Sequence, residues 1–483
     1  MKLNELLSGI EVVSIIGGNM ERNIGSVCTD SRRCSDGALF VAIKGVDTDG
    51  HDYIDSAIEK GATTIVCEHM PEKRDNICYV LINGGRKGVA HIAANFYGQP
   101  SKLLNLIGVT GTNGKTSIAT LLYNMFTKLG YSCGLISTIA NYVGETMYPT
   151  INTTPGPLEL NELIREMTDK GCEYCFMEVS SHAIDQDRIE GLHFRGGIFT
   201  NLTHDHLDYH KTFANYLNCK KRFFDSLPST AFALTNNDDK NGKVMVQNTK
   251  AAVSTYSCHG IADFKTKVME MNIDGMQLNI NGTEVWCRLI GMHNAANLTA
   301  IYATALLLGA NKDEVVRIMS DLKSVAGRLE YFKGKNNVVA AVDYAHTPDA
   351  LENVLITLEE LKPQGDLICV FGCGGNRDKS KRPEMGAIAG KYATRIIVTS
   401  DNPRFEKPEE IIEEIKAGMD SPTRSKSLFI TDRTEAIRTA ILTAKSDSII
   451  LIAGKGHEDY QIINGVKHHL DDREIVKETF SLQ

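Results

Sequence analysis

The chain alternates short apolar runs with amphipathic stretches, a pattern typical of α/β proteins. Three apolar runs near the start predict strands, at residues 38–43, 63–67 and 78–82. Stretches 53–60 and 87–97 have helical periodicity, and a turn-forming segment at 98–100 follows them. Residues 1–99 are therefore expected to form a small α/β domain, which begins with a helix and a strand.

The middle of the chain continues this alternation with longer elements. Apolar runs predict strands at residues 103–109, 173–179 and 196–200, and helical periodicity predicts helices at 118–129, 295–308 and 312–322. Gly327 marks the next boundary. A second domain is therefore expected over residues 100–326.

From residue 338 onward, strand and helix patterns alternate regularly. Strands are predicted at 338–342, 367–371, 395–399 and 449–453, and helices at 349–361, 383–392, 408–418 and 433–445. This order predicts a parallel, doubly wound sheet in a third domain, residues 327–483. Polar clusters directly follow the four strands, at 343–346, 372–382, 400–404 and 454–458. Because parallel strands share one carboxyl edge, these clusters are expected to meet at one ligand-binding rim.

Composition limits the class of protein. A chain of 483 residues with 42% hydrophobic residues is too long for one core, which agrees with three domains. The net charge of -8 offers no general basis for binding nucleic acid, and no apolar run reaches the about 20 residues of a membrane span. Twelve cysteines scattered among apolar segments suit a reducing cytoplasm. We expect a soluble cytoplasmic protein, with a monomer favoured.

A glycine-rich loop, Thr-Gly-Thr-Asn-Gly-Lys-Thr-Ser, lies between the predicted strand 103–109 and the predicted helix 118–129. Glycines let backbone amides turn onto an anion, Lys115 adds a positive charge, and the Thr116 hydroxyl can ligate Mg²⁺. An ordinary strand-to-helix turn is the alternative, but strand, loop and helix together favour nucleotide binding. The candidate contacts are Gly111, Thr112, Asn113, Gly114, Lys115, Thr116 and Ser117.

Carboxylates and imidazoles follow two strands of the same predicted domain. Glu178 ends one strand, and the segment 201–210, rich in histidine and aspartate, follows the next. Groups of these types near a phosphate loop are candidates for Mg²⁺ ligands or for side chains that orient them. The residue types alone do not choose among them.

Four segments together resemble the bacterial Mur ligase family in order and separation: TGTNGKTS, EVSSH, NLTHDHLDYH and DYAHTPDAL. The resemblance covers essentially the whole chain. It implies a small N-terminal UDP-binding domain, a central P-loop ATPase-like parallel-sheet domain and a C-terminal Rossmann-like domain. It also implies ATP-driven amide bond formation on peptidoglycan precursors through an acyl phosphate.

The resemblance assigns roles that spacing alone does not. Lys220 matches a lysine that CO₂ carbamylates, so that it can ligate magnesium. Two Mg²⁺ ions are implied, one held by Thr116 and Glu178 and one by His206 and modified Lys220, with Lys115 as a further catalytic residue. Implied contacts to the base and ribose of ATP are Asn294, Arg328, Asp343 and His346. Implied contacts to the UDP-sugar-peptide are Ser31, His51, Asn152, Thr153, Thr154, Ser180, Gln186 and Arg188.

The tetrapeptide Asp401-Asn402-Pro403-Arg404 matches the signature of family members that add meso-diaminopimelate to UDP-N-acetylmuramoyl-L-alanyl-D-glutamate. That amino acid differs from lysine by a second carboxylate, which a guanidinium can bind with two parallel hydrogen bonds. Arg377, Gly454 and Glu458 match the remaining contacts, Glu458 taking the distal ammonium.

Three alternatives stay open at this point. The same chemistry could use L-lysine as the acceptor, against which the tetrapeptide at 401–404 argues. A folate-polyglutamate-type ligase would share the phosphate loop and the lysine, but not the N-terminal segment Asp30-Ser31-Arg32. A P-loop nucleotide-binding switch would need the loop alone, and not the acidic and histidine motifs.

Overall fold

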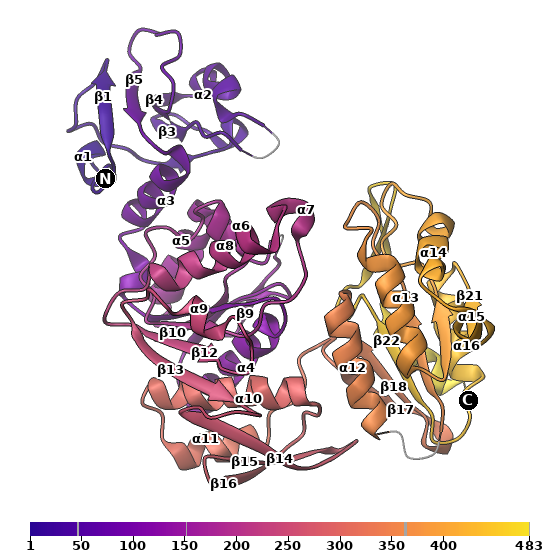
Figure 1. The fold of residues 1–483 in the computed structure, drawn as a ribbon. Helices are drawn as coiled ribbons and strands as arrows, with labels where there is room; N and C mark the ends of the chain where they lie inside the picture. The colour runs from indigo at the N-terminus through magenta and orange to yellow at the C-terminus, as the bar shows by residue number, and fades with distance from the viewer. Residues whose placement is uncertain (46–47, 151, 362–364, 483) are drawn as a thin grey trace.

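The computed structural model describes residues 1–45, 48–150, 152–361 and 365–482. Figure 1 shows three lobes in chain order, each built around its own sheet, with the central lobe joining the other two. The expected domain boundaries, after residues 99 and 326, fall in connections between successive sheets. Within the described part of the chain, every helix is too short or too polar to traverse a lipid bilayer.

The N-terminal lobe contains a five-stranded sheet of order β1-β5-β4-β3-β2, in which only β1 is antiparallel to its neighbour. Its strands are β1 Val12–Ile16, β2 Val27–Cys28, β3 Ala38–Val41, β4 Ala62–Cys67 and β5 Cys78–Ile82. Its helices are α1 Leu3–Leu6, α2 Ile54–Glu59 and α3 Gly85–Phe96. The strands and helices expected in this region are confirmed, with ends that shift by at most two residues.

The central lobe is built on an eleven-stranded sheet of order β16-β15-β14-β13-β12-β11-β6-β10-β7-β8-β9. Its parallel part contains β6 Asn105–Thr110, β7 Cys133–Ile136, β10 Tyr174–Glu178, β11 Gly196–Phe199, β12 Phe232–Asn236 and β13 Ala252–Ser257. The helices are α4 Lys115–Lys128, α5 Pro157–Asp169, α6 Ser181–Asp185, α7 Leu207–His210, α8 Phe213–Asp225, α9 Gly242–Met245, α10 Met292–Leu307 and α11 Lys312–Met319.

Two apolar layers cover the faces of this sheet. Because side chains alternate along a strand, Ile107 faces the layer of α4, α10 and α11, whereas Leu106 faces the layer of α5, α6 and α8. The central strands are therefore buried on both faces, which explains why they read as continuous apolar runs.

Strands β7, β12 and β13 of the parallel part were not predicted from the sequence, and neither were the strands that extend the central sheet at both ends. The extending strands are β8 Asn141–Val143, β9 Thr146–Tyr148, β14 Phe264–Asn272, β15 Gly275–Ile280 and β16 Thr283–Cys287. Strand β14 runs parallel to β13, whereas the β14–β15, β15–β16, β7–β8 and β8–β9 pairs are antiparallel. Most residues of β14 are at least partly exposed, so this strand lacks the long apolar run that marks β6. The turns at 273–274 and 281–282 were the available signal.

The C-terminal lobe contains a six-stranded sheet of order β17-β18-β22-β19-β20-β21, parallel except for β17. Its strands are β17 Glu330–Lys333, β18 Val339–Asp343, β19 Leu367–Phe371, β20 Arg395–Val398, β21 Ser427–Phe429 and β22 Ile449–Ala453. Its helices are α12 Pro348–Leu361, α13 Lys381–Tyr392, α14 Pro408–Ala417, α15 Ser421–Ser425, α16 Arg433–Leu442 and α17 Asp472–Ser481. Helices α12–α14 cover one face and α16 and α17 the other, which confirms the doubly wound sheet. A hairpin, β23 Tyr460–Ile463 with β24 Val466–His469, was not expected.

A buried ion pair connects the helices α16 and α17, on one face of this sheet, to the carboxyl end of its strand β22. Arg433 and Asp472 are both 0% exposed, and the guanidinium donates to the carboxylate through Nε at 2.8 Å and Nη2 at 2.7 Å. Arg433 Nη2 also donates to the carbonyl oxygen of Ala453, the last residue of β22. One side chain therefore joins α16, α17 and the end of a central strand.

We expect Arg433→Met to lower the free energy of unfolding by about 3–5 kcal/mol, because it leaves Asp472 as an uncompensated buried charge. Urea denaturation followed by circular dichroism measures the change. Arg438→Met on the same helix, where the guanidinium is partly exposed, is the matched control and should shift stability by less than about 1 kcal/mol. Equal shifts for both variants would contradict the importance of the buried pair.

Candidate active site

The phosphate loop joins β6 to α4 and depends on two glycines. Gly111 has φ +151°, and a Cβ there would lie 1.9 Å from Thr200 Oγ1. Gly114, at the N-terminus of α4, has φ +87°. Asn201 fastens the loop, because its carbonyl oxygen accepts from the Thr112 amide at 2.8 Å and its Oδ1 accepts from the Asn113 amide at 2.9 Å. The loop is thus held against the carboxyl end of β11 in the form expected of a phosphate cradle.

The side-chain nitrogens of two lysines meet at one carbonyl oxygen of this loop. Lys115 Nζ donates to Gly111 O at 2.9 Å, and Lys220 Nζ of α8 donates to the same oxygen at 2.8 Å. Lys220 is 1% exposed, and burial, followed by the charge of Lys115, brings its pKa well below the ordinary value. Burial also lowers the pKa of Lys115. This geometry favours an uncharged Lys220 amine.

Glu178 is buried at the carboxyl end of β10, beside the loop. Its carboxylate accepts hydrogen bonds from the Thr138 amide at 2.8 Å and the Thr138 hydroxyl at 3.2 Å. Thr116 lies on the first turn of α4, where its hydroxyl accepts from Arg328 Nη2 at 3.1 Å. Arg328 therefore connects the start of the C-terminal lobe to the phosphate loop.

His206 lies at the N-terminus of α7 with φ +54°. Its ring is 5.0 Å from that of His182, centroid to centroid, and burial lowers its pKa to about 4. Its Nε2 lies 3.3 Å from Asp205 Oδ2, whose charge acts in the opposite direction on this pKa. A lowered pKa favours the neutral imidazole, the form that can ligate a metal.

The oxygen donors of this region suit Mg²⁺. Thr116 and Glu178 offer the hydroxyl and carboxylate oxygens that this cation prefers, whereas an unmodified Lys220 offers none. Within the described residues, no three His, Cys, Asp or Glu side chains are grouped as a protein-only metal site. Thr116 and Glu178 are therefore the side chains beside the loop that could hold a magnesium ion.

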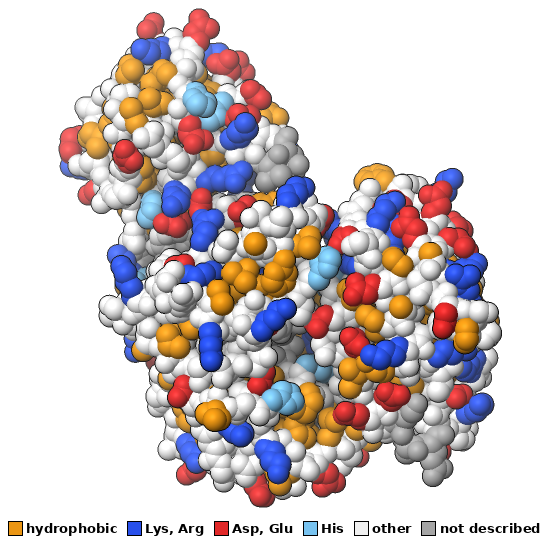
Figure 2. All heavy atoms as spheres, in the orientation of Figure 1, with side chains coloured by type: hydrophobic (Ala, Val, Ile, Leu, Met, Phe, Trp, Pro, Cys, Tyr) orange, Lys and Arg blue, Asp and Glu red, His pale blue; other side chains and the backbone are white. Residues whose placement is uncertain are grey.

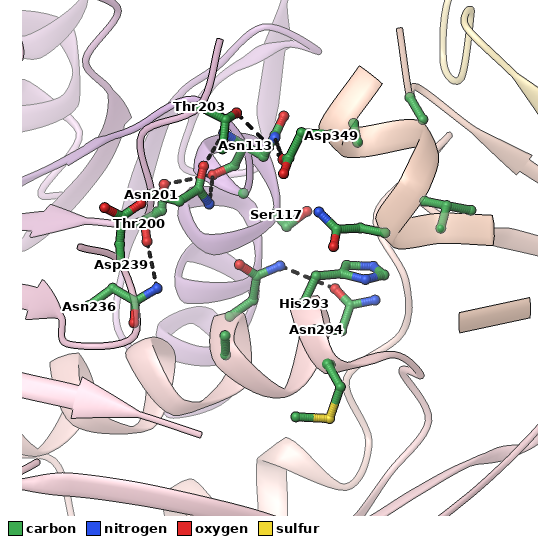
Figure 3. A pocket seen from close by; sticks show the side chains of 18 of the residues that line it. Asn113, Ser117, Thr200, Asn201, Thr203, Asn236, Asp239, His293, Asn294 and Asp349 are labelled. Carbon is green, nitrogen blue, oxygen red and sulfur yellow. Dashed lines mark hydrogen bonds between the residues drawn. The ribbon is translucent and has the colours of Figure 1, made fainter. Parts of the chain in front are cut away.

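A cavity of about 370 Å³ lies between the phosphate loop, the start of α10 and the segment 343–354. Figure 3 shows Asn113 of the loop pointing toward Asp349 of α12, and the two side chains are joined by a hydrogen bond of 2.8 Å. All four residues expected to contact the base and ribose line this cavity: Asn294, Arg328, Asp343 and His346. The Asn294 amide, however, donates to Ile290 O at 2.9 Å, which leaves its oxygen to contacts such as that with Asn297.

A second cavity, of about 360 Å³, lies where the carboxyl edges of the central and C-terminal sheets face each other. Figure 2 shows the surface hollowed between the N-terminal and C-terminal lobes. Members of all four polar clusters line the cavity, so the predicted convergence on one rim is confirmed: Tyr344, His346, Gly372, Gly374, Arg377, Asp401, Asn402, Arg404, Gly454 and Glu458. The opposite wall comes from Thr153, His182 and the segment 204–208.

Two guanidinium groups make part of this rim strongly cationic. Arg404 has φ +54°, its amide donates to Ile462 O of the hairpin at 3.0 Å, and its Nη1 donates to Gly375 O at 2.8 Å. Burial first, and the neighbouring Arg377 second, lower its pKa. The remaining donors of Arg404 and the charge of Arg377 are suited to holding an anion.

The residues expected to hold the peptide part of the substrate lie close together. Arg188 donates to Thr154 O at 2.8 Å and through Nη2 to Gln186 Oε1 at 2.7 Å, and Thr154 Oγ1 lies 3.3 Å from Ser180 Oγ. Thr153 accepts from the Thr138 hydroxyl at 3.1 Å, next to Glu178. Asn152 is exposed at the edge of this group.

The two N-terminal residues expected to contact the uridine diphosphate, Ser31 and His51, line neither of the two cavities described above. A cavity of about 260 Å³ is lined by residues 27–30 and 156–159, with Arg33 in its wall, whereas neither Ser31 nor His51 lines it. His51 is engaged within its lobe, because Nδ1 lies 2.6 Å from Asp49 and Nε2 accepts from the Glu68 amide. The structure therefore brings together the central and C-terminal candidates, and leaves these two apart from them.

Several residues of the site were missed from the sequence. Asp349 bridges α12 to the phosphate loop, His204 faces Asp378 across the lobes at 3.5 Å, and Lys455 lies beneath the rim. Each of these three residues lies in a sequence motif described above. Its place in that motif was the only sign in the sequence that it could belong to the site. Side-chain pairing across distant segments has no sequence pattern of its own.

Comparison with known proteins agrees with this architecture. The description "Mur ligase family, catalytic domain" matches residues 23–95, "Mur ligase middle domain" matches 109–305, and "Mur ligase, glutamate ligase domain" matches 327–456. The chain belongs to the Mur ligase family, which makes it an ATP-dependent ligase. The expected resemblance is confirmed.

Individual relatives share the full length of the chain. UDP-N-acetylmuramoyl-L-alanyl-D-glutamate--2,6-diaminopimelate ligase of Phocaeicola vulgatus is 55% identical over 483 residues, covering 100% of both chains. The protein of the same name from Bacteroides fragilis is 53% identical with the same coverage. A solved structure of an enzyme with this name has a TM-score of 0.71 and 30% identity, covering 100% of this chain and 99% of that one.

We expect Gly111→Ala to weaken binding of a non-hydrolysable ATP analogue by about 100-fold, because the added Cβ clashes with Thr200 and displaces the loop. Isothermal titration calorimetry measures this affinity. Gly130→Ala is the control, since Gly130 also has positive φ but its Cβ would meet open space. Unchanged affinity in Gly111→Ala would contradict the cradle geometry.

Proposed function

We propose that this protein joins meso-diaminopimelate to the γ-carboxylate of D-glutamate in UDP-N-acetylmuramoyl-L-alanyl-D-glutamate, forming ADP and phosphate. The observation that carries the proposal is the cavity in which Arg377, Arg404 and Glu458 face the histidine segment beside the phosphate loop. The names of the full-length relatives support the same substrates. Three domains, 1–99, 100–326 and 327–483, would bind the UDP-sugar, ATP and amino acid respectively.

The first step is attack of the glutamate carboxylate on the γ-phosphate of ATP. Lys115 stabilises the negative charge that accumulates as two anions approach, and backbone amides of residues 111–117 hold the phosphates in line. The product of this step is an acyl phosphate. The acceptor amine, held at the opposite wall, then attacks the acyl carbon and phosphate leaves.

Thr116 and Glu178 are proposed to hold one Mg²⁺, and His206 with carbamylated Lys220 a second. Magnesium would supply positive charge at the γ-phosphate oxygens. Lys220 is suited to the modification because two lysines share the Gly111 oxygen, which favours the neutral amine that reacts with CO₂. The carbamate formed there replaces repulsion from Lys115 by attraction.

Arg404 and Arg377 are proposed to bind the distal carboxylate of the acceptor, and Glu458 its distal ammonium. Lysine lacks this carboxylate, so it would leave the half-buried guanidinium of Arg404 and the exposed one of Arg377 without an anion. Asp401, Asn402 and Gly454 complete this wall. A monomer is proposed because residues of one chain line both walls of this cavity, and a cytoplasmic location is proposed because the substrates are nucleotides.

We expect Lys220→Met to lower kcat by about 10²–10³-fold, because it removes the anion proposed to hold the second magnesium. Steady-state phosphate release measures kcat, and intact-mass analysis of the unmodified enzyme detects the added CO₂. Lys221→Met is the control, since Lys221 pairs with Asp225 on another face of α8. Equal activity of Lys220→Met and the parent enzyme would contradict the role of Lys220.

The central experiment is an ATP-dependent ligation assay with UDP-N-acetylmuramoyl-L-alanyl-D-glutamate, offering meso-diaminopimelate and L-lysine separately and identifying products by mass. We expect the diaminopimelate product to dominate, and Arg404→Ala to lower kcat/KM for diaminopimelate by about 10²-fold or more. Arg395→Ala, at the opposite end of β20, is the control. Preference for lysine by the parent enzyme would overturn the acceptor assignment, and ADP release without either substrate would favour a nucleotide switch.

A further inference from the structure

A fully buried lysine lies beneath the acceptor cavity and has no part in the steps above. Lys455 follows β22 after Gly454, and its side chain is 0% exposed. Lysine is almost never fully buried unless its ammonium is paired. The partners of this ammonium therefore indicate its role.

Lys455 Nζ donates to two residues proposed to contact the acceptor. It lies 3.2 Å from Asn402 Oδ1 and 3.3 Å from Glu458 Oε2, and Asn402 Nδ2 donates to the same Glu458 oxygen at 2.8 Å. Asn402 Oδ1 also accepts from the Ile462 amide at 2.9 Å, which connects the group to the hairpin. The ammonium thus holds Glu458 and Asn402 in one orientation from the side away from the cavity.

Lys455 also balances charge beneath the rim. Burial acts to raise the pKa of the Asp401 carboxyl. The positive charges of Lys455 and Arg433 nevertheless hold this pKa below its usual range. Arg433 is already bonded to Asp472 through two nitrogens. Without Lys455, the cations left near the carboxylates of Asp401 and Glu458 would be Arg433, which is committed to Asp472, and Arg404 at the cavity. Glu458 would keep its hydrogen bonds from Asn402 and Tyr344 but would lose its bond to a buried ammonium.

We propose that Lys455 is a positioning residue for acceptor selection, which presents the Glu458 carboxylate to the distal ammonium of the incoming diamino acid. This proposal rests on the proposed function. Lys455 acts through Glu458 and Asn402 and does not itself line the cavity. Arg404 would therefore bind the distal carboxylate of the acceptor, and the Glu458 carboxylate, which Lys455 orients, would bind its distal ammonium.

The test compares two acceptors, meso-diaminopimelate and (2S)-2-aminopimelate, which keeps the distal carboxylate but lacks the distal ammonium. The parent enzyme should prefer the diamino acid. In Lys455→Met, we expect kcat/KM for diaminopimelate to fall about tenfold or more, with a much smaller fall for 2-aminopimelate. The preference of the enzyme for the diamino acid over 2-aminopimelate would then be largely lost. KM for ATP and for the UDP-substrate should stay within about twofold of the parent values.

Two further variants separate positioning from general destabilisation. Lys455→Gln keeps a hydrogen-bond donor without the charge, and should retain an intermediate preference if Lys455→Met folds poorly. Lys426→Met removes a lysine that bonds two carbonyl oxygens elsewhere in the same lobe, and should leave the preference intact. An unchanged preference in both Lys455 variants, or a parallel rise of KM for all substrates, would overturn the proposal. Failure of the parent enzyme to use diaminopimelate would instead refute the proposed function.

Discussion

The site depends on a constraint of parallel sheets, which deliver the carboxyl ends of their strands to one edge. In this protein, two such edges face each other across one cavity. The central edge presents Glu178, the phosphate loop and the histidine segment, and the C-terminal edge presents Arg404 and its neighbours. The reaction brings a nucleotide, a carboxylate and an amine into contact. Two rigid sheets can therefore share the task of holding these groups.

Buried charge is the second theme of the structure. Lys220, Lys455, Arg382 and Arg433 all lie at 0–1% exposure, each at or behind a part of the site. Three of them have carboxylate partners, as Arg382 has in Glu406 and Glu414. Lys220 differs, because its partners are oxygens of the phosphate loop and its nearest charge is another lysine. That contrast is why Lys220 is suited to modification, whereas the others are suited to holding loops in place.

Contacts between lobes connect these two scaffolds directly. Arg328 reaches Thr116, Asp349 reaches Asn113, and His204 lies opposite Asp378. Each contact joins a residue of the central edge to one of the C-terminal lobe. The arrangement of the phosphate loop and the position of the acceptor site are thus physically coupled, as expected of a reaction whose intermediate must be shielded from water.

The sequence by itself determined many of the parallel strands, such as β6, β10, β19 and β22, because they are buried on both faces and read as apolar runs. It did not predict β7, β12 and β13, which are parallel strands of the central sheet. It also located the phosphate loop and the polar clusters after each strand, since these are local features of strand-to-helix connections. Tertiary structure alone decided which clusters meet, that β14–β16 extend the central sheet, and that Lys220 and Lys455 are buried. Burial and pairing of these lysines arise from segments far apart in the chain, and no local pattern of residues records such distances.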